Sequence, residues 1–183
     1  MGLRLISFLS LGLLAINFGP LHAQDLPSAT VAVLDLQLVI RECAAAKDVR
    51  RQLQVYRNKY QQEIATTEAV LRKEERELKG QQALLTPKVF DEKRQDFERK
   101  VIQVQRRVQD RSRALDRAFN VAMNQIQKTI VPIVKDLTMK RNFNIVVDRS
   151  RVLFAKSSLD ITDIVLKTLN ERLTSVMVPE PVK

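Results

Sequence analysis

The side chains that most often carry chemistry in proteins are scarce in this sequence. Of its 183 residues one is His (His22), one is Cys (Cys43) and four are Gly, and three of the glycines lie with His22 in the first 23 residues. Beyond that stretch neither a His-based triad nor a His-based metal site can be built, and Gly80 alone cannot supply a glycine-rich phosphate loop. We therefore expect no enzyme activity, no metal and no cofactor.

Cys43 has no second cysteine with which to form a disulfide inside the chain. In an oxidising compartment it would be buried, free, or paired with another chain. We predict a small buried apolar residue at the point where a strand leads into a helix, and a reactive thiol is the alternative.

The residues that remain able to bind something are basic. Residues 44–141 contain 23 Lys and Arg against 13 Asp and Glu, whereas the rest of the chain after residue 23 contains 7 against 8. A basic helical surface suits nucleic acid, anionic lipid or acidic protein, and a merely solvated face is the alternative for any one residue. The positive charge is densest in seven residues, which we predict to contact a binding partner: Arg99, Lys100, Arg106, Arg107, Arg111, Arg113 and Arg117.

The basic region has the apolar spacing of two long helices. Neutral or apolar residues recur at helical spacing on either side of residues 80–87, which contain Gly80 and the pair Thr86–Pro87. We predict an antiparallel coiled-coil hairpin with its tip near 80–87, Thr86 as a helix cap and a kink at Pro132; a single kinked helix is the alternative. Spacings of about eleven residues in the first helix indicate straight or slightly right-handed packing. The two stripes are Leu53, Tyr56, Tyr60, Ile64, Thr67, Leu71 and Leu78, then Phe97, Val101, Val104, Val108, Leu115, Phe119, Ala122, Ile126, Ile130, Ile133 and Leu137.

The first 23 residues have the layout of a secretory signal. A basic start at Arg4 is followed by an apolar run over residues 5–16, then Gly19–Pro20 and a small Ala23 before polar residues. The run is shorter than the roughly 20 residues that a membrane-spanning helix needs, so we predict cleavage after Ala23, with an uncleaved anchor as the alternative. Export argues against a nucleic-acid partner, as does the small number of aromatic side chains available for base stacking.

The two chain pieces that flank the hairpin are predicted to form one small body. Residues 30–34 have the composition of a buried strand and 36–43 the spacing of a short helix, while 143–148 and 152–155 are predicted to form a β-hairpin. A final helix is expected to begin at Asp160 as its cap. We assign 24–43 and 142–176 to the body, 44–141 to the arm and 177–183 to a disordered tail; so small a body with open strand edges predicts self-association.

The order of these segments resembles the Skp (OmpH-like) family of periplasmic chaperones. The resemblance rests on Val-Ala-Val-Leu-Asp at 31–35, the long basic hairpin, Phe-Asn-Ile-Val-Val-Asp at 143–148, Leu-Phe-Ala at 153–155 and Asp-Ile-Thr-Asp-Ile-Val-Leu-Lys at 160–167. It implies an α+β fold in which three chains trimerise through their strands and the helical arms enclose a cavity. A homotrimer of this kind would hold unfolded outer-membrane β-barrel proteins without ATP, and the resemblance also implies lipopolysaccharide as a ligand.

Two other functions fit the residues less well. A structural or adaptor coiled coil of the cell envelope would bind a specific folded partner in fixed proportion and would have little affinity for unfolded chains. A cytoplasmic nucleic-acid-binding protein would require that residues 1–23 are retained.

Overall fold

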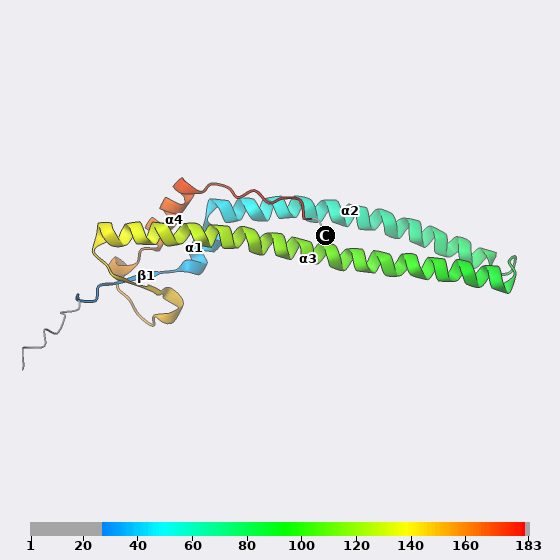
Figure 1. Ribbon diagram of the computed structural model, residues 1–183, viewed down its shortest axis with the longest axis horizontal. Coiled ribbons are helices and arrows are strands. Elements are labelled where there is room, and N and C mark those ends of the chain that lie inside the picture. Colours follow the sequence, from blue (N-terminus) through cyan, green and yellow to red (C-terminus); the bar gives the residue numbers. More distant parts are fainter. Residues whose placement is uncertain (1–26, 182–183) are drawn as a thin grey trace, which may run out of the picture.

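The structure is a computed structural model that describes residues 27–181, so the predicted signal peptide lies outside the described residues. Two long helices form a hairpin that projects from a small body, and the body is made from both ends of the described chain (Figure 1). None of the described helices is long and apolar enough to cross a membrane. The elements are β1 (Val31–Leu34), α1 (Leu36–Glu42), α2 (Ala44–Gln81), α3 (Pro87–Arg141), β2 (Ile145–Asp148) and α4 (Thr162–Arg172), with 3-10 turns at Arg149–Arg151 and Ser157–Leu159.

The strands β1 and β2 pair in parallel, and the helical hairpin is part of the crossover that connects them. Parallel neighbours cannot be joined by a tight turn, so a long insertion between them is compatible with the pairing. Val31 lies opposite Ile145 and Leu34 opposite Asp148, and the β1 residues 32–34 are buried. The prediction of long helices with a small strand region is confirmed in this form.

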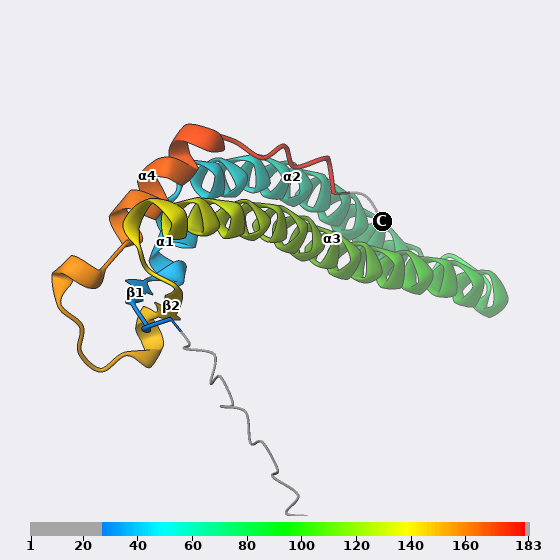
Figure 2. The ribbon, with the colours of Figure 1, turned by 60° about the vertical axis from the view of Figure 1, so that its left-hand side comes forward.

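The predicted third strand is wrong. Residues 152–155 form no strand, and the side chains of Leu153 and Phe154 are fully or almost fully exposed. The carboxylate of Asp148 accepts a hydrogen bond from the backbone N–H of Ser150 (2.8 Å) and starts a 3-10 turn at the point where a β-hairpin would have continued. The connection to α4 therefore loops away from the sheet (Figure 2).

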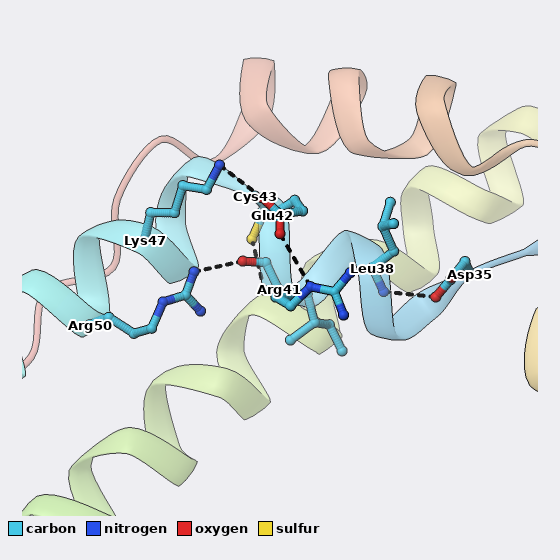
Figure 3. Close-up of polar contacts among 8 residues, drawn as sticks. Asp35, Leu38, Arg41, Glu42, Cys43, Lys47 and Arg50 are labelled. Atoms are coloured by element: carbon cyan, nitrogen blue, oxygen red, sulfur yellow. Dashed lines mark hydrogen bonds and ion pairs between the residues drawn. The ribbon is translucent and has the colours of Figure 1, made fainter.

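The junction between α1 and α2 fixes how the arm leaves the body (Figure 3). Asp35 caps α1 by accepting from the N–H of Leu38 (2.8 Å), and Cys43 separates the two helices with an extended backbone (φ −64°, ψ 149°). Cys43 is buried, as predicted, and its thiol lies 3.7 Å from the carbonyl of Ile40. Beyond the break, the side chain of Asn170 in α4 accepts from the N–H of Ala44 (2.8 Å) and so caps α2.

The hairpin has two parts that differ in burial. We call residues 44–60 and 114–141 the base of the arm, and residues 61–113 the distal arm. Every buried residue of α2 and α3 lies in the base, and no residue of the distal arm is buried. The predicted stripes do face the seam between the helices, except that Val108 and Phe119 are exposed. Five buried residues of α2 and α3 were missing from those stripes: Ala45, Ala46, Val49, Ala114 and Met123.

The predicted helix ends are largely confirmed. α3 begins at Pro87 with Thr86 in the capping position, although the Thr86 side chain makes no capping hydrogen bond. α3 ends at Arg141, and the capping residue Asn142 adopts the left-handed conformation that Asn tolerates (φ 52°). Pro132 lies on the exposed side of α3 and does not interrupt the helix.

The last helix packs across the base of the arm, and a segment after it follows α2. α4 starts one residue later than predicted: the carboxylate of Asp160 accepts from the N–H of Thr162 (2.8 Å), while Ile161 occupies the capping position. The predicted disordered tail is wrong for residues 177–181. We call residues 174–181 the strap, because they run along α2 with Val176 and Val178 buried (Figure 1).

Candidate binding surfaces of the helical arm

The seven predicted binding residues all lie on α3, but they do not form one free cluster. Two of them are neutralised within their own helix, because Arg99 pairs with Asp96 and Arg113 pairs with Asp110 (3.7 Å). Both arginines stay well exposed, so these pairs are worth little energetically but reduce the local net charge.

Two further members of the set hold the hairpin together. The ammonium of Lys100 bonds to both carboxylate oxygens of Glu74 on α2, at 2.8 and 2.9 Å. The guanidinium of Arg111 lies 4.2 Å from the centre of the Tyr60 ring and 3.5 Å from the carboxylate of Glu63. Arg111 is also the least exposed of the seven, so these contacts explain its position without any external partner.

The remaining three, Arg106, Arg107 and Arg117, are exposed and make no ion pair or side-chain hydrogen bond within the described part of the chain. Arg106 and Arg117 are eleven residues apart and share one face of α3. The positive charge is therefore concentrated midway along the arm and towards its base. Residues 61–98, nearer the tip, have 7 basic against 9 acidic side chains.

An apolar groove with basic side chains lies beside this region. It has a volume of about 390 Å³ and runs between α2 and α3 in the base of the arm. Leu53, Leu115 and the partly exposed Phe119 supply its apolar surface, and Arg50 and Arg57 its positive charge. The sequence had placed Phe119 in the seam; the stripe correctly identified an apolar residue but could not show that it stays open to solvent.

The distal arm also has an incompletely filled seam. A cavity of about 260 Å³ between the helices is lined by Leu78 and Phe97 together with charged residues, including the Glu74–Lys100 pair. At the tip, Leu84 is exposed. An apolar seam that contains open space and charged walls can rearrange at small cost, because few close-packed contacts would be lost.

The body presents apolar side chains as well. Val31 and Ile145, which are paired across the sheet, are partly exposed, as is Leu159. Leu153 and Phe154 project from the loop that replaces the predicted third strand. Isolated exposed apolar residues are ordinary, but bulky ones beside a two-stranded sheet with open edges are typical of a surface that another chain covers.

No group of metal-ligating side chains occurs among residues 27–181, and every buried polar side-chain atom in that range has a hydrogen-bond partner. The surfaces of the arm are thus suited to binding through apolar contact and charge.

The architecture is that of a long helical hairpin inserted into a small mixed body. The family model described as outer membrane protein (OmpH-like) matches residues 30–169, so this chain belongs to that family. Its structure is similar to that of a candidate outer membrane chaperone (OmpH-like) from Caulobacter crescentus CB15, with a TM-score of 0.76 and 18% sequence identity. The match covers 88% of this chain and 95% of the other. No curated protein matches the sequence significantly.

Proposed function

We propose that the protein is an ATP-independent holdase chaperone of the periplasm, which binds unfolded outer-membrane β-barrel proteins and keeps them from aggregating. Membership of the OmpH-like family supports this proposal, as does the description of the Caulobacter protein as a candidate outer membrane chaperone. The predicted signal peptide supports a periplasmic location.

The distal arm is the observation that carries the proposal. It spans 53 residues, from 61 to 113, and none of them is buried, although its stripe is apolar. A surface of this kind can make many weak contacts with differing sequences, because no single close-packed arrangement has to form. The apolar groove in the base adds a second surface with basic side chains around it.

Charge would bring the client to these surfaces. The exposed guanidinium groups of Arg106, Arg107 and Arg117 attract acidic segments over about one Debye length, roughly 10 Å at 0.1 M salt. Lipopolysaccharide and anionic lipid are negatively charged, as are acidic segments of a client, so they would compete with the client for these three arginines.

We also propose that three chains assemble through their bodies, as the family resemblance implies. The paired residues Val31 and Ile145, together with the exposed Leu153 and Phe154, supply apolar surface for such contacts. In a trimer, three arms would surround one space in which a client could be held.

The test is suppression of aggregation. An unfolded barrel protein is diluted from urea into buffer that contains the chain without residues 1–23, and light scattering is followed at low and high salt. We expect suppression that is weaker at high salt. The triple variant Arg106→Gln, Arg107→Gln, Arg117→Gln should suppress less than the matched control Lys128→Gln, Lys135→Gln, Lys140→Gln, which removes equal charge from exposed positions nearer the body.

Two results would contradict the proposal. If the unchanged protein does not suppress aggregation at low salt, the holdase function is wrong and an adaptor function becomes the better explanation. If the two triple variants behave alike, the charge that matters is not localised to the middle of the arm.

A further inference from the structure

The strap makes an ordered set of contacts with one face of α2. It follows α4, continues in the same direction as α2 and ends beside Tyr60 (Figure 1). The match to the OmpH-like family model ends at residue 169, before the strap begins. The contacts of residues 174–181 are therefore a feature of this chain that the match does not cover.

Three side chains of α2 recognise the main chain of the strap. The amide of Gln52 donates to the carbonyl of Val176 (2.9 Å) and accepts from the N–H of Val178 (2.9 Å), as a neighbouring β-strand would. The hydroxyl of Tyr56 donates to the carbonyl of Val178 (3.2 Å), and that of Tyr60 donates to the carbonyl of Pro181 (2.6 Å). These contacts do not depend on which side chains the strap carries.

The recognising groups are themselves held in place. The Gln52 amide also donates to the carboxylate of Asp48 (2.7 Å), which can only accept, so the orientation of the amide is fixed. The Tyr60 hydroxyl is protonated at neutral pH and can donate, and burial raises its pKa further. Arg111 covers the Tyr60 ring and also donates to the carbonyl of Pro181 (3.4 Å).

In the middle of the strap, residues 175–179, the side chains alternate between the α2 side and solvent. Val176 and Val178 are buried, whereas Met177 between them is 86% exposed. The side-chain ion pair between Glu180 and Lys59 (2.7 Å) is exposed and therefore weak. The face of α2 thus accepts an extended segment in which two alternate side chains are apolar and buried, and such alternation is the pattern of β-barrel strands.

We propose that the α2 face formed by Gln52, Tyr56 and Tyr60 is a binding site for extended polypeptide, and that the strap occupies it as a built-in competitor which an unfolded client displaces. The identity of the client rests on the proposed holdase function. The existence of the site does not, because the strap itself shows what the site accepts.

The competition should be measurable because the strap is tethered. Only residues 173–175 separate α4 from Val176, so the effective concentration of the strap is in the millimolar range or above. A separate peptide that binds with a dissociation constant of roughly 0.1 mM would then appear about tenfold weaker against the full chain than against a chain without the strap. A client with many other contacts should show a smaller change, about threefold.

The first experiment tests the site without any client. A fluorescent peptide with the sequence of residues 174–181 is titrated against the full chain and against a chain that ends at Ser175, and binding is followed by anisotropy. We expect about tenfold tighter binding to the shortened chain. Changing Gln52→Ala in that chain should weaken binding, as should Asp in the peptide at the two buried Val positions. Circular dichroism establishes that the shortened chain keeps its helices.

The second experiment releases the strap without removing it, so it does not depend on the shortened chain folding. The full-length variant Val176→Asp, Val178→Asp should bind an unfolded barrel protein about threefold more tightly than the control Met177→Asp, whose changed side chain points to solvent. Added strap peptide should reverse the gain.

The proposal is wrong if the shortened chain binds the peptide no better than the full chain does, or if strap release leaves client affinity equal to that of the Met177→Asp control. The peptide result separates this outcome from failure of the holdase proposal. A chain that binds the peptide but never suppresses aggregation has the site and lacks the chaperone function.

Discussion

The base of the arm and the distal arm are continuous helices with the same kind of apolar stripe, yet only the base buries it. In the base, α1 and α4 pack on the hairpin and the strap lies along α2, so the stripe is covered by a third layer. Within the described residues, the strap reaches the distal arm only at Arg111, and the rest of the distal arm consists of two helices without a third layer (Figure 2). Two helices in contact leave much of each stripe open, so the third layer decides how deeply an apolar residue is buried.

The same difference appears in the polar contacts. In the distal arm the ion pairs mostly join residues three or four apart on one helix, such as Arg94 with Glu98 (2.6 Å), and these stabilise a helix without holding it to its neighbour. In the base, hydrogen bonds connect distant parts of the chain, as between Asn170 and Ala44. Contacts between distant segments therefore hold the two helices of the base in fixed positions. The two helices of the distal arm have fewer such contacts and can shift relative to each other more easily.

The largest expected effect is a loss of stability that depends on position along the arm. Ile126→Ala removes a fully buried side chain from the base and should lower the free energy of unfolding by about 2–5 kcal/mol. Leu71→Ala removes a half-buried side chain from the distal arm and should cost about 1 kcal/mol. Urea unfolding followed by circular dichroism measures both; equal losses would mean that the two parts do not differ as described.

A smaller effect is expected where α4 caps α2. Asn170→Ala leaves the N–H of Ala44 without its partner and should cost about 0.5–2 kcal/mol, the usual range for a lost helix cap. Asn120→Ala, at an exposed position of α3, serves as the control and should change the unfolding free energy by less than about 0.5 kcal/mol. If both variants unfold at the same urea concentration, the contact between Asn170 and Ala44 does not stabilise the base of the arm.

Acid should loosen the strap before it unfolds the base. Hydrogen bonds from Arg51 and then Gln52 hold the pKa of Asp48 below its ordinary 3.8, and Lys59 holds the pKa of Glu180 below its ordinary 4.5. Both carboxylates have a lower pKa in the folded protein than in the unfolded chain. They therefore stabilise the strap fully when the pH is above the ordinary pKa, and this stabilisation is lost as the pH falls through the lowered pKa. Asp48 acts through Gln52, which it orients.

Methyl NMR between pH 7 and pH 3 measures this difference. The signals of Val176 and Val178 should change below about pH 4, while those of the buried Ile126 stay native at the onset of that change. Simultaneous changes of all three would mean that the strap and the base form a single cooperative unit.

The smallest expected effect concerns the one ion pair that joins the helices in the outer half of the distal arm. Lys100→Gln removes the contact with Glu74 and should lower the free energy of unfolding by no more than about 0.5 kcal/mol, with the difference reduced in high salt. Urea unfolding at two salt concentrations checks it. A loss above 1 kcal/mol would contradict the description of a loosely held distal arm.

The helices and the faces they bury could be predicted from the sequence, because apolar residues three or four positions apart lie on one face of a helix. The stripe that contains Ile126 and Ile133 lies in the core as expected. Depth of burial could not be predicted in this way, since Phe119 and Ile126 lie seven residues apart in the same stripe, yet Phe119 is 37% exposed and Ile126 is fully buried. Part of the charge pattern was available: Asp96 and Asp110 stand three residues before Arg99 and Arg113, which indicates local pairing.

Two errors have a common physical cause. Residues 152–155 have the composition of a strand, but no neighbouring strand pairs with them among the described residues, and Asp148 turns the chain beforehand. The tail has the composition of a disordered segment, with Pro179, Glu180 and Pro181, but polar side chains of α2 bind its main chain. The deciding fact is whether another part of the chain pairs with the segment: none of the described residues does so for 152–155, and α2 does so for the tail. Composition does not contain that information.

Hydrogen exchange of the chain alone and with an unfolded barrel protein would test the central claim most directly. We predict that amides of residues 61–113 exchange faster than those of the base in the free protein, and that the client protects the distal arm and the groove near Phe119 while α4 stays unchanged. Uniform exchange along the free arm, or no protection by the client, would contradict the account.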